Sequence, residues 1–319
     1  MRTLIRVRTA MVAAAALAAA CAACSSSPAS HSGSASAGSA SAGFPVTVTT
    51  VAGKVHLTSR PDAIVSLAPT ATEMLYAIGA GKQVKAVDSD SDYPPGAPVT
   101  KLSAYEPNAE AIAAYKPDLV VISNNIDSIT AKLTALSIPV LDLPAAANVT
   151  GVYAELTELG EATGHVAQAR TEDQKIRSQI AAIIASEPKH KAPLTYYYEL
   201  STDPYYSVTD STFIGNLLSL LGMKSVADAA TGAAAAGGYP ELSPEFILKS
   251  NPDYIILSDT GVDGGQTAAT VAARPGWSVL TAVKDNHVIV LNADIASRWG
   301  PRIVQLLQSV AAAVKSTSS

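Results

Sequence analysis

One stretch of this sequence occurs twice, 135 residues apart. Residues 110–123 read E-A-I-A-A-Y-K-P-D-L-V-V-I-S, residues 245–258 read E-F-I-L-K-S-N-P-D-Y-I-I-L-S, and five of the 14 positions are identical. Each copy predicts a short helix, a Pro-Asp turn and an apolar run of strand length. A chain that repeats such a unit in its two halves is predicted to form two similar lobes. The space between two lobes is where we expect a ligand site.

Strand and helix patterns alternate on both sides of the middle of the chain, which predicts an α/β fold with a central sheet in each lobe. For the first lobe, residues 44–145, we predict a hairpin over 44–57 that turns at Gly53-Lys54, strands at 63–67, 84–87, 119–123 and 139–143, and a helix over 70–81. For the second lobe, residues 189–319, we predict strands at 194–198, 254–258 and 287–291 and helices over 212–221, 243–249 and 300–314.

Residues 146–188 are predicted to connect the lobes through helices. From His165 to Ser186 the apolar residues recur at helical spacing, and Pro188 ends the pattern. A helix of this length reaches roughly 33 Å. We therefore expect a single stiff helix to bridge the lobes, and only limited closure when a ligand binds.

The first 43 residues are predicted to be a secretory signal peptide followed by a flexible tether. Three arginines precede a short apolar stretch that ends in small residues and two cysteines, the pattern of a secretory signal over residues 1–23. The site resembles that of bacterial lipoproteins, with Cys24 as the lipidated residue and Cys21 as the alternative; plain secretion with cleavage near Ala23 also fits. Residues 24–43 are a Ser/Ala/Gly tether without charged side chains.

Composition and motifs argue against several classes of protein. The two cysteines lie in the leader, so thiol catalysis and Cys-ligated metal are not expected in the body of the chain. Beyond the leader, 19 Lys and Arg stand against 27 Asp and Glu, a balance that does not favour nucleic acid. The five histidines form no i, i+4 pair, and no nucleophile-elbow or phosphate-loop motif is complete. We expect no enzymatic activity, no cofactor and no metal site.

Tyrosine is unusually frequent, with 12 Tyr against 3 Phe and 2 Trp. A ring with a polar tip suits a pocket for a large ligand that is partly apolar, although packing at strand ends explains any single Tyr equally well. Tyr105 and Tyr239 hold matching places, each just before one copy of the repeat. We expect these two residues, Tyr93 and Arg298 to surround one hollow.

Two pairs of charged residues are further candidates. Asp294 and Arg298 could offer a ligand an acceptor and a five-donor fork, or could form a surface ion pair of little energetic consequence. Glu110 and Glu245 each lie two residues after a predicted helix cap. They either complement the helix dipole or dock the two lobes on a partner.

Several motifs resemble those of one known class. The segments I-V-S-L-A-P-T-A-T-E (64–73), K-P-D-L-V-V (116–121), R-P-G-W (274–277) and G-P-R (300–302) occur here in the order found in the vitamin B12/ferric-siderophore substrate-binding proteins of ABC importers. The likeness covers about residues 44–315, and it is greatest to the vitamin B12-binding members. Several positions that are Trp or Phe in those members are Tyr here, and a Trp is replaced near Ser123-Asn124.

The resemblance implies a function and a set of site residues. The protein would capture a metal chelate, a cobalamin-like corrinoid or a ferric siderophore, outside the cell membrane to which its lipid anchors it. It would act as a monomer and deliver the chelate to a permease dimer with its ATPase. Glu110 and Glu245 would dock on the permease. The residues implied as ligand contacts are Tyr93, Tyr105, Tyr198, Tyr206, Tyr239, Asp294 and Arg298. Two alternatives remain: a receptor for bare ferric ion that uses Tyr205 and Tyr206, and a sensor or enzyme on the same fold.

Overall fold

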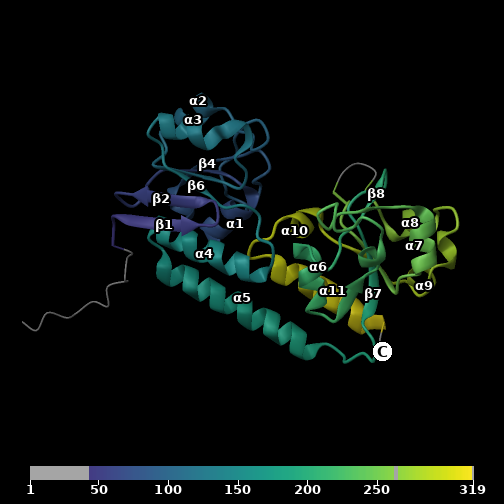
Figure 1. The fold of residues 1–319 in the computed structure, drawn as a ribbon. Helices are drawn as coiled ribbons and strands as arrows, with labels where there is room; N and C mark the ends of the chain where they lie inside the picture. The colour runs from purple at the N-terminus through teal and green to yellow at the C-terminus, as the bar shows by residue number, and fades with distance from the viewer. Residues whose placement is uncertain (1–42, 262–264, 318–319) are drawn as a thin grey trace, which may run out of the picture. The chain divides into compact units, whose positions relative to one another are not determined.

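A computed structural model describes residues 43–261 and 265–317, all of which belong to one compact unit (Figure 1). The predicted signal peptide, both cysteines and the tether as far as residue 42 lie outside the described residues. None of the helices in the described ranges is both long and apolar enough to cross a membrane.

The first lobe contains a parallel four-stranded sheet in the order β4-β3-β5-β6. Its strands are β3 (Ile64–Leu67), β4 (Val84–Val87), β5 (Leu119–Ile122) and β6 (Val140–Asp142). Its helices are α1 (Pro69–Ala77), α2 (Ala109–Ala113) and α3 (Ile129–Ala135), with 3-10 turns η1 (Gly81–Gln83) and η2 (Ile126–Ser128). The hairpin of β1 (Val46–Thr50) and β2 (Gly53–Leu57) precedes this sheet.

The second lobe repeats the plan, with a parallel sheet in the order β9-β7-β11-β12. Its strands are β7 (Leu194–Glu199), β9 (Met223–Ser225), β11 (Tyr254–Leu257) and β12 (Val288–Val290), beside a small antiparallel pair, β8 (Tyr205–Tyr206) and β10 (Glu241–Leu242). Its helices are α6 (Phe213–Ser219), α7 (Pro244–Ser250), α8 (Ala268–Ala272), α9 (Thr281–Lys284), α10 (Ala293–Ser297) and α11 (Ile303–Thr317), with 3-10 turns η3 (Val226–Ala229) and η4 (Trp277–Val279).

The repeated sequence occupies the same place in both sheets, which confirms the prediction of two similar α/β lobes. Strand β5 lies beside β3 in one lobe, and β11 lies beside β7 in the other. The turn aspartates that the two copies share make equivalent hydrogen bonds. Asp118 Oδ2 accepts hydrogen bonds of 2.9 Å from the backbone N–H groups of Asp62 and Ala63, just before β3. Asp253 Oδ2 accepts bonds of 2.7 Å from the backbone N–H and the hydroxyl of Thr195, in β7.

The strands are buried on both faces, as expected for parallel sheets covered by helices. Alternate side chains of each strand enter different hydrophobic clusters: Leu119 and Val121 join one, Val120 and Ile122 another. Each lobe has a cluster of its own on one face of its sheet. On the other face, residues of both lobes share one continuous cluster with the connecting helices.

Two helices connect the lobes, α4 (Val149–Thr163) and α5 (Val166–Ser186). They lie side by side, and α5 also packs against α11 (Figure 1). The predicted bridging helix is therefore present, with a partner helix before it. Gly164 separates the two with a left-handed backbone, φ 75°, which glycine adopts without steric cost.

Two local predictions were wrong in detail. The hairpin turns at Val51-Ala52, because Thr50 pairs with Gly53 and Gly53 already belongs to β2. The helix predicted over 70–81 ends at Ala77, and Gly79 follows with φ 84°. In both places a turn exists close to the predicted position, and its exact boundary was missed.

Candidate ligand-binding site

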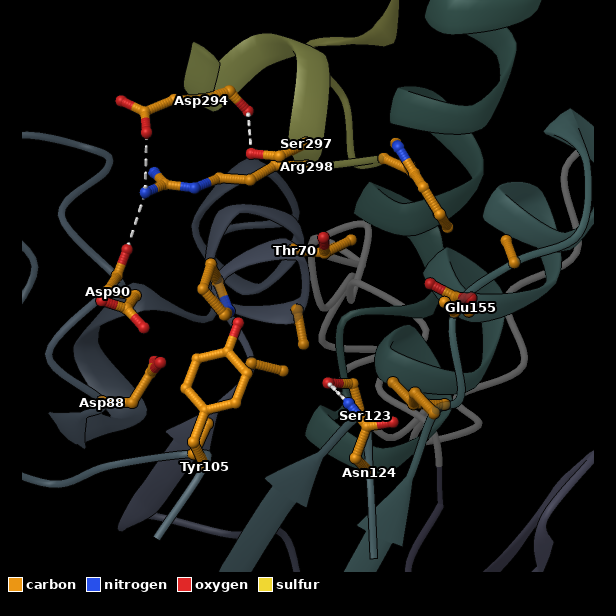
Figure 2. A pocket seen from close by; sticks show the side chains of 18 of the residues that line it. Thr70, Asp88, Asp90, Tyr105, Ser123, Asn124, Glu155, Asp294, Ser297 and Arg298 are labelled. Atoms are coloured by element: carbon orange, nitrogen blue, oxygen red, sulfur yellow. Dashed lines mark hydrogen bonds and ion pairs between the residues drawn. The ribbon is translucent and has the colours of Figure 1, made fainter. Parts of the chain in front are cut away.

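A cavity of about 450 Å³ lies at the carboxyl ends of all four strands of the first sheet (Figure 2). In open parallel sheets this edge is the usual place for a ligand, because the loops that leave the strands meet there. The lining residues after β3, β4, β5 and β6 are, in turn, Ala68–Ala71, Asp88 and Asp90, Ser123 and Asn124, and Leu143, Ala145 and Ala146. Tyr105 also lines this cavity.

The rest of the wall comes from later parts of the chain. Helix α10 and the residues after it contribute Asp294, Ser297, Arg298 and Trp299. Helix α4 contributes Glu155, which lies across the cavity from Asp88 and Asp90 in Figure 2. The indole ring of Trp299 stacks on Phe213 of α6 with centroids 4.7 Å apart, which fixes this wall against the second lobe.

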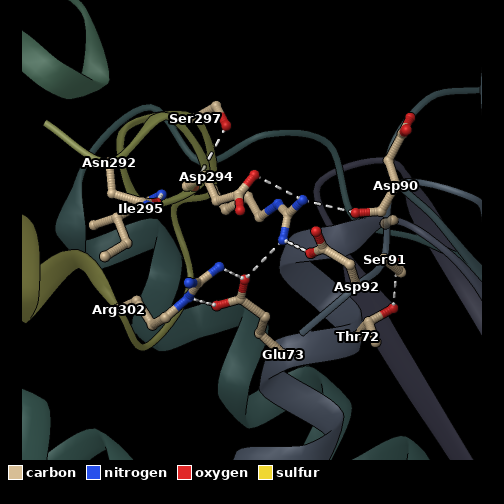
Figure 3. A network of polar contacts seen from close by, with 12 residues as sticks. Thr72, Glu73, Asp90, Ser91, Asp92, Asn292, Asp294, Ile295, Ser297 and Arg302 are labelled. Carbon is tan, nitrogen blue, oxygen red and sulfur yellow. Dashed lines mark hydrogen bonds and ion pairs between the residues drawn. The ribbon is translucent and has the colours of Figure 1, made fainter. Parts of the chain in front are cut away.

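Arg298 is the centre of a polar network that joins distant parts of the chain. Figure 3 labels its partners Asp90, Asp92 and Asp294. One terminal nitrogen donates to Asp92 Oδ1, and the other lies 3.1 Å from Asp294 Oδ1 and 2.8 Å from the carbonyl oxygen of Asp90. Hydrogen bonding to Arg298 holds the pKa of Asp92 below its ordinary value. The predicted Asp294–Arg298 pair therefore exists, but the guanidinium is shared with other acceptors.

A second ion pair supports the first. Arg302 forms a two-pronged contact with Glu73 of α1, and both side chains are buried. The guanidinium of Arg302 also lies over the Tyr93 ring, 4.1 Å from its centroid. Loss of either arginine would leave a buried or half-buried carboxylate without its partner, so both residues support the fold as well as the cavity wall.

The structure brings together only part of the predicted tyrosine set. Tyr105 lines the cavity with Asp294 and Arg298, and its side chain is exposed. Tyr93 lines a different cavity, of about 460 Å³, with residues of α1, α5 and α11. Of the four residues expected to surround one hollow, Tyr105 and Arg298 line this cavity, whereas Tyr93 and Tyr239 do not.

The remaining three tyrosines are not among the residues that line this cavity. Tyr198 is fully buried, because β7 is covered on both faces and this side chain joins the shared hydrophobic cluster, and burial raises its pKa. Tyr206 lies on β8, opposite Glu241 of β10, and is partly exposed. Tyr239 is partly exposed, and burial of the rest of its phenol raises its pKa.

The two candidate docking residues occupy equivalent and exposed positions. Glu110 lies in the first turn of α2, where the Asn108 side chain caps the helix by accepting from the Ala111 N–H at 2.9 Å. Glu245 lies in the first turn of α7, where Ser243 caps by accepting from the Phe246 N–H at 3.1 Å. These contacts confirm the predicted caps.

Several cavity residues were missed by the sequence analysis. The run from Asp88 to Asp92 is not among the predicted site residues, yet Asp88 and Asp90 line the cavity, and Asp90 and Asp92 accept hydrogen bonds from Arg298. Its signal was its position directly after a buried strand, which Ser123 and Asn124 share. Glu155 gave no such signal, because an acid on an amphipathic helix normally faces solvent. Throughout residues 43–261 and 265–317, no cluster of three or more His, Cys, Asp or Glu is arranged to hold a metal ion.

Comparison with known proteins supports this description of the fold. An uncharacterised ABC-transporter substrate-binding lipoprotein of Bacillus subtilis is 30% identical over 283 residues, 85% of this chain and 86% of that protein. A vitamin B12-binding protein of Pectobacterium atrosepticum is 31% identical over 258 residues, 78% of this chain and 87% of that protein.

A solved structure of similar fold is a possible iron-binding, periplasmic solute-binding protein of Staphylococcus epidermidis. It is 26% identical, with a TM-score of 0.68 over 80% of this chain and 99% of that one. The family model described as periplasmic binding protein matches residues 64–295, which include both parallel sheets and the cavity lining as far as Asp294. With this match, the repeated lobes and the relatives above, the chain belongs to the periplasmic binding protein family.

Proposed function

We propose that this protein is the extracytoplasmic receptor of an ABC importer, and that it captures a metal chelate and passes it to the permease. The chelate is a cobalamin-like corrinoid, a haem-like ring or a ferric siderophore. The observation that carries the proposal is the cavity of about 450 Å³ at the carboxyl ends of the first sheet, closed on another side by the α10 segment. A cavity of this size, lined by both apolar and polar residues from separate parts of the chain, suits a bulky ligand with a hydrogen-bonding rim.

The names of the relatives point to the same ligand class. One relative is named for vitamin B12 binding, and a solved structure of the same fold is described as a possible iron-binding protein. No motif for catalysis is complete in the sequence, and we propose a binding function without turnover. Tyr105, Asp294 and Arg298 are proposed ligand contacts. Tyr93, Tyr206 and Tyr239 can reach the same ligand only if it extends beyond the cavity or the loops rearrange.

Docking on the permease is assigned to Glu110 and Glu245. Both are exposed, and the internal repeat puts them at the same position in each lobe. Two equivalent acids, one per lobe, match a partner with two equivalent basic sockets, as a permease dimer has. We assign anchoring to a lipid on Cys24, with Cys21 as the alternative; a relative is itself named a lipoprotein.

The alternative receptor for bare ferric ion is less well supported. It would need the phenols of Tyr205 and Tyr206 to converge on one ion. The two residues are neighbours on β8, where successive side chains point to opposite faces, and the Tyr205 ring packs against Trp277 with centroids 5.6 Å apart. Adding ferric ion alone should therefore give no phenolate colour.

Titration calorimetry with cyanocobalamin, haemin and a panel of ferric siderophores tests the proposed function. We expect one of these chelates to bind with one-to-one stoichiometry, and the apo-ligands and free metal ions to bind far more weakly. Deletion of the gene should abolish uptake of the same chelate by the cell. If no chelate binds the purified protein, the proposal is wrong.

A further inference from the structure

The polar side chains that line the cavity are mostly hydrogen-bond acceptors. Four acidic side chains face it, and Arg298 is the one cationic side chain in its lining. The acids are Asp88, Asp90, Glu155 and Asp294. A wall of this composition suits a ligand that donates hydrogen bonds, and it opposes a ligand that brings negative charge.

The single cation is already neutralised by the protein. Both terminal nitrogens of Arg298 contact carboxylates, those of Asp92 and Asp294, and one also donates to the carbonyl oxygen of Asp90. Only about a tenth of its side chain is exposed. An anionic ligand would have to displace these partners to reach the guanidinium, and would then face the carboxylates that it had displaced.

Glu155 is the most unusual group in the cavity wall. It is 8% exposed and lies on α4, between the core-facing residues of that helix and the cavity. Among the described residues its carboxyl has no hydrogen-bond or ion-pair partner. Burial, with a smaller contribution from the Glu158 charge, raises its pKa to about 8. At neutral pH the group therefore holds its proton and can both accept and donate a hydrogen bond.

Asp88, on the opposite wall, has one carboxyl oxygen without a partner among the described residues. The side chain is buried, and its other carboxyl oxygen accepts from the Ser91 hydroxyl. The Nε1–H of Trp299 also has no hydrogen-bond acceptor among the described residues. A buried polar atom without a partner is costly, and in a binding cavity the ligand is the natural source of the missing bond.

We propose that the chelate bound here is uncharged or cationic and carries amide groups on its rim, and that Glu155 is one of the groups that hydrogen-bond to those amides. The inference rests on the proposed function and narrows its ligand class. Chelates that expose carboxylates or catecholate oxygens are excluded by the same argument, because the cavity offers them no free cation.

A panel of four chelates tests the charge class by titration calorimetry. Cyanocobalamin is uncharged and rimmed by carboxamides, and ferrioxamine B is a cationic hydroxamate with amides. Haemin carries propionates, and ferric enterobactin is an anionic catecholate. We expect the tightest binding from one of the first two, by about tenfold or more over both anionic chelates. Tighter binding of haemin or ferric enterobactin would overturn the inference but leave the proposed function intact, whereas failure of all chelates to bind would overturn both.

Three variants test the role of Glu155 with the best ligand of that panel. Glu155→Gln presents a donor and an acceptor in the same place, so its affinity should stay within about threefold of the wild type. Glu155→Leu fills the same space without a hydrogen-bond donor or acceptor. This variant should bind the ligand about tenfold more weakly, which corresponds to about 1.4 kcal/mol. Glu161→Leu, on the same helix but outside the cavity lining, is the control and should bind as the wild type does.

Chemical denaturation of the same variants separates binding from folding. Removing a buried polar group that lacks a partner does not weaken the fold, so Glu155→Leu should unfold at no lower a denaturant concentration than the wild type. Unchanged affinity in a folded Glu155→Leu would remove this residue from the site. Equal losses in Glu155→Gln and Glu155→Leu would show that a protonated carboxyl is not what the ligand contacts.

Discussion

At the scale of single residues, the cavity wall contains a carboxylic acid whose charge the fold disfavours. Burial raises the pKa of Glu155 to about 8, so between pH 4.5 and pH 8 the folded protein keeps a proton that the unfolded chain has lost. The contribution of Glu155 to stability therefore falls as the pH rises through this window. The unusual side chain costs stability at neutral pH, as groups placed for binding often do.

Glu155→Gln should remove this dependence. We expect the variant to match the wild type below pH 4.5 and to become progressively more stable than it up to pH 8. The gain in the free energy of unfolding should be about 1.4 kcal/mol for each unit by which folding raises the pKa of Glu155. Denaturant midpoints at pH 4.5, 6 and 8 measure the effect, with Glu161→Gln as the control. A gain that is the same at all three pH values would contradict the raised pKa.

At the scale of elements, the repeated unit explains why each sheet begins where it does. In both lobes the turn aspartate accepts two hydrogen bonds on one carboxylate oxygen from the start of the first strand. Asp118 and Asp253 thereby join the repeated strand to its neighbour before the ladder begins. The aspartate that both copies share is thus explained in part by its role in aligning the repeated strand with its neighbour.

Asp118→Ala should lower the free energy of unfolding by about 1–2 kcal/mol, because two hydrogen bonds to a charged acceptor are lost. Asp253→Ala should cost at least as much, since Asp253 is less exposed. The Asn variants are matched controls: one amide oxygen can still accept both bonds, so their losses should be smaller. Urea denaturation measures all four. If Ala and Asn were equally destabilising at either site, the shared oxygen would not be the cause.

The helices that join the lobes explain how the two halves are held. Residues of both lobes enter one hydrophobic cluster together with α4, α5 and α11. Opening the lobes would expose part of this cluster to water, at about 25 cal/mol for each Å² of apolar surface. A stiff connection of this kind favours loop and side-chain adjustment over a wide hinge motion.

At the scale of the whole molecule, we expect small-angle scattering to give the same radius of gyration with and without the bound chelate, within experimental error. The reason is the shared cluster and the helical connection. The comparison needs a chelate shown to bind by calorimetry, and a chelate that does not bind serves as the control. A clear decrease in the radius on binding would indicate a hinge that these contacts do not predict.

Permease docking is also a property of the whole molecule, because it needs both lobes at once. The double variant Glu110→Gln/Glu245→Gln should bind the chelate normally and lose most of its uptake. The chain offers a matched control: Glu106 and Glu241 are also exposed and lie four residues before each docking residue. The double variant Glu106→Gln/Glu241→Gln should transport as the wild type does. Equal uptake by both double variants would remove Glu110 and Glu245 from the interface.

The amino-acid sequence by itself determined the two-lobed α/β fold, the bridging helix and the helix caps. These features depend on local periodicity and on a repeat that is visible in one dimension, as the Pro-Asp units around Asp118 and Asp253 show. It also placed Asp294, Arg298 and Tyr105 among the candidates, because each lies next to a predicted strand or repeat.

Only the tertiary structure decided which candidates share a cavity. Tyr198 lies in the core because the strand that carries it is covered on both faces, and Tyr93 faces another cavity beside Arg302. Glu155 faces the cavity because helices and loops distant in sequence close around it. The burial and the hydrogen-bond partners of a side chain depend on residues that are distant in sequence. An acid on a helix can therefore be identified as a site residue only from the folded structure.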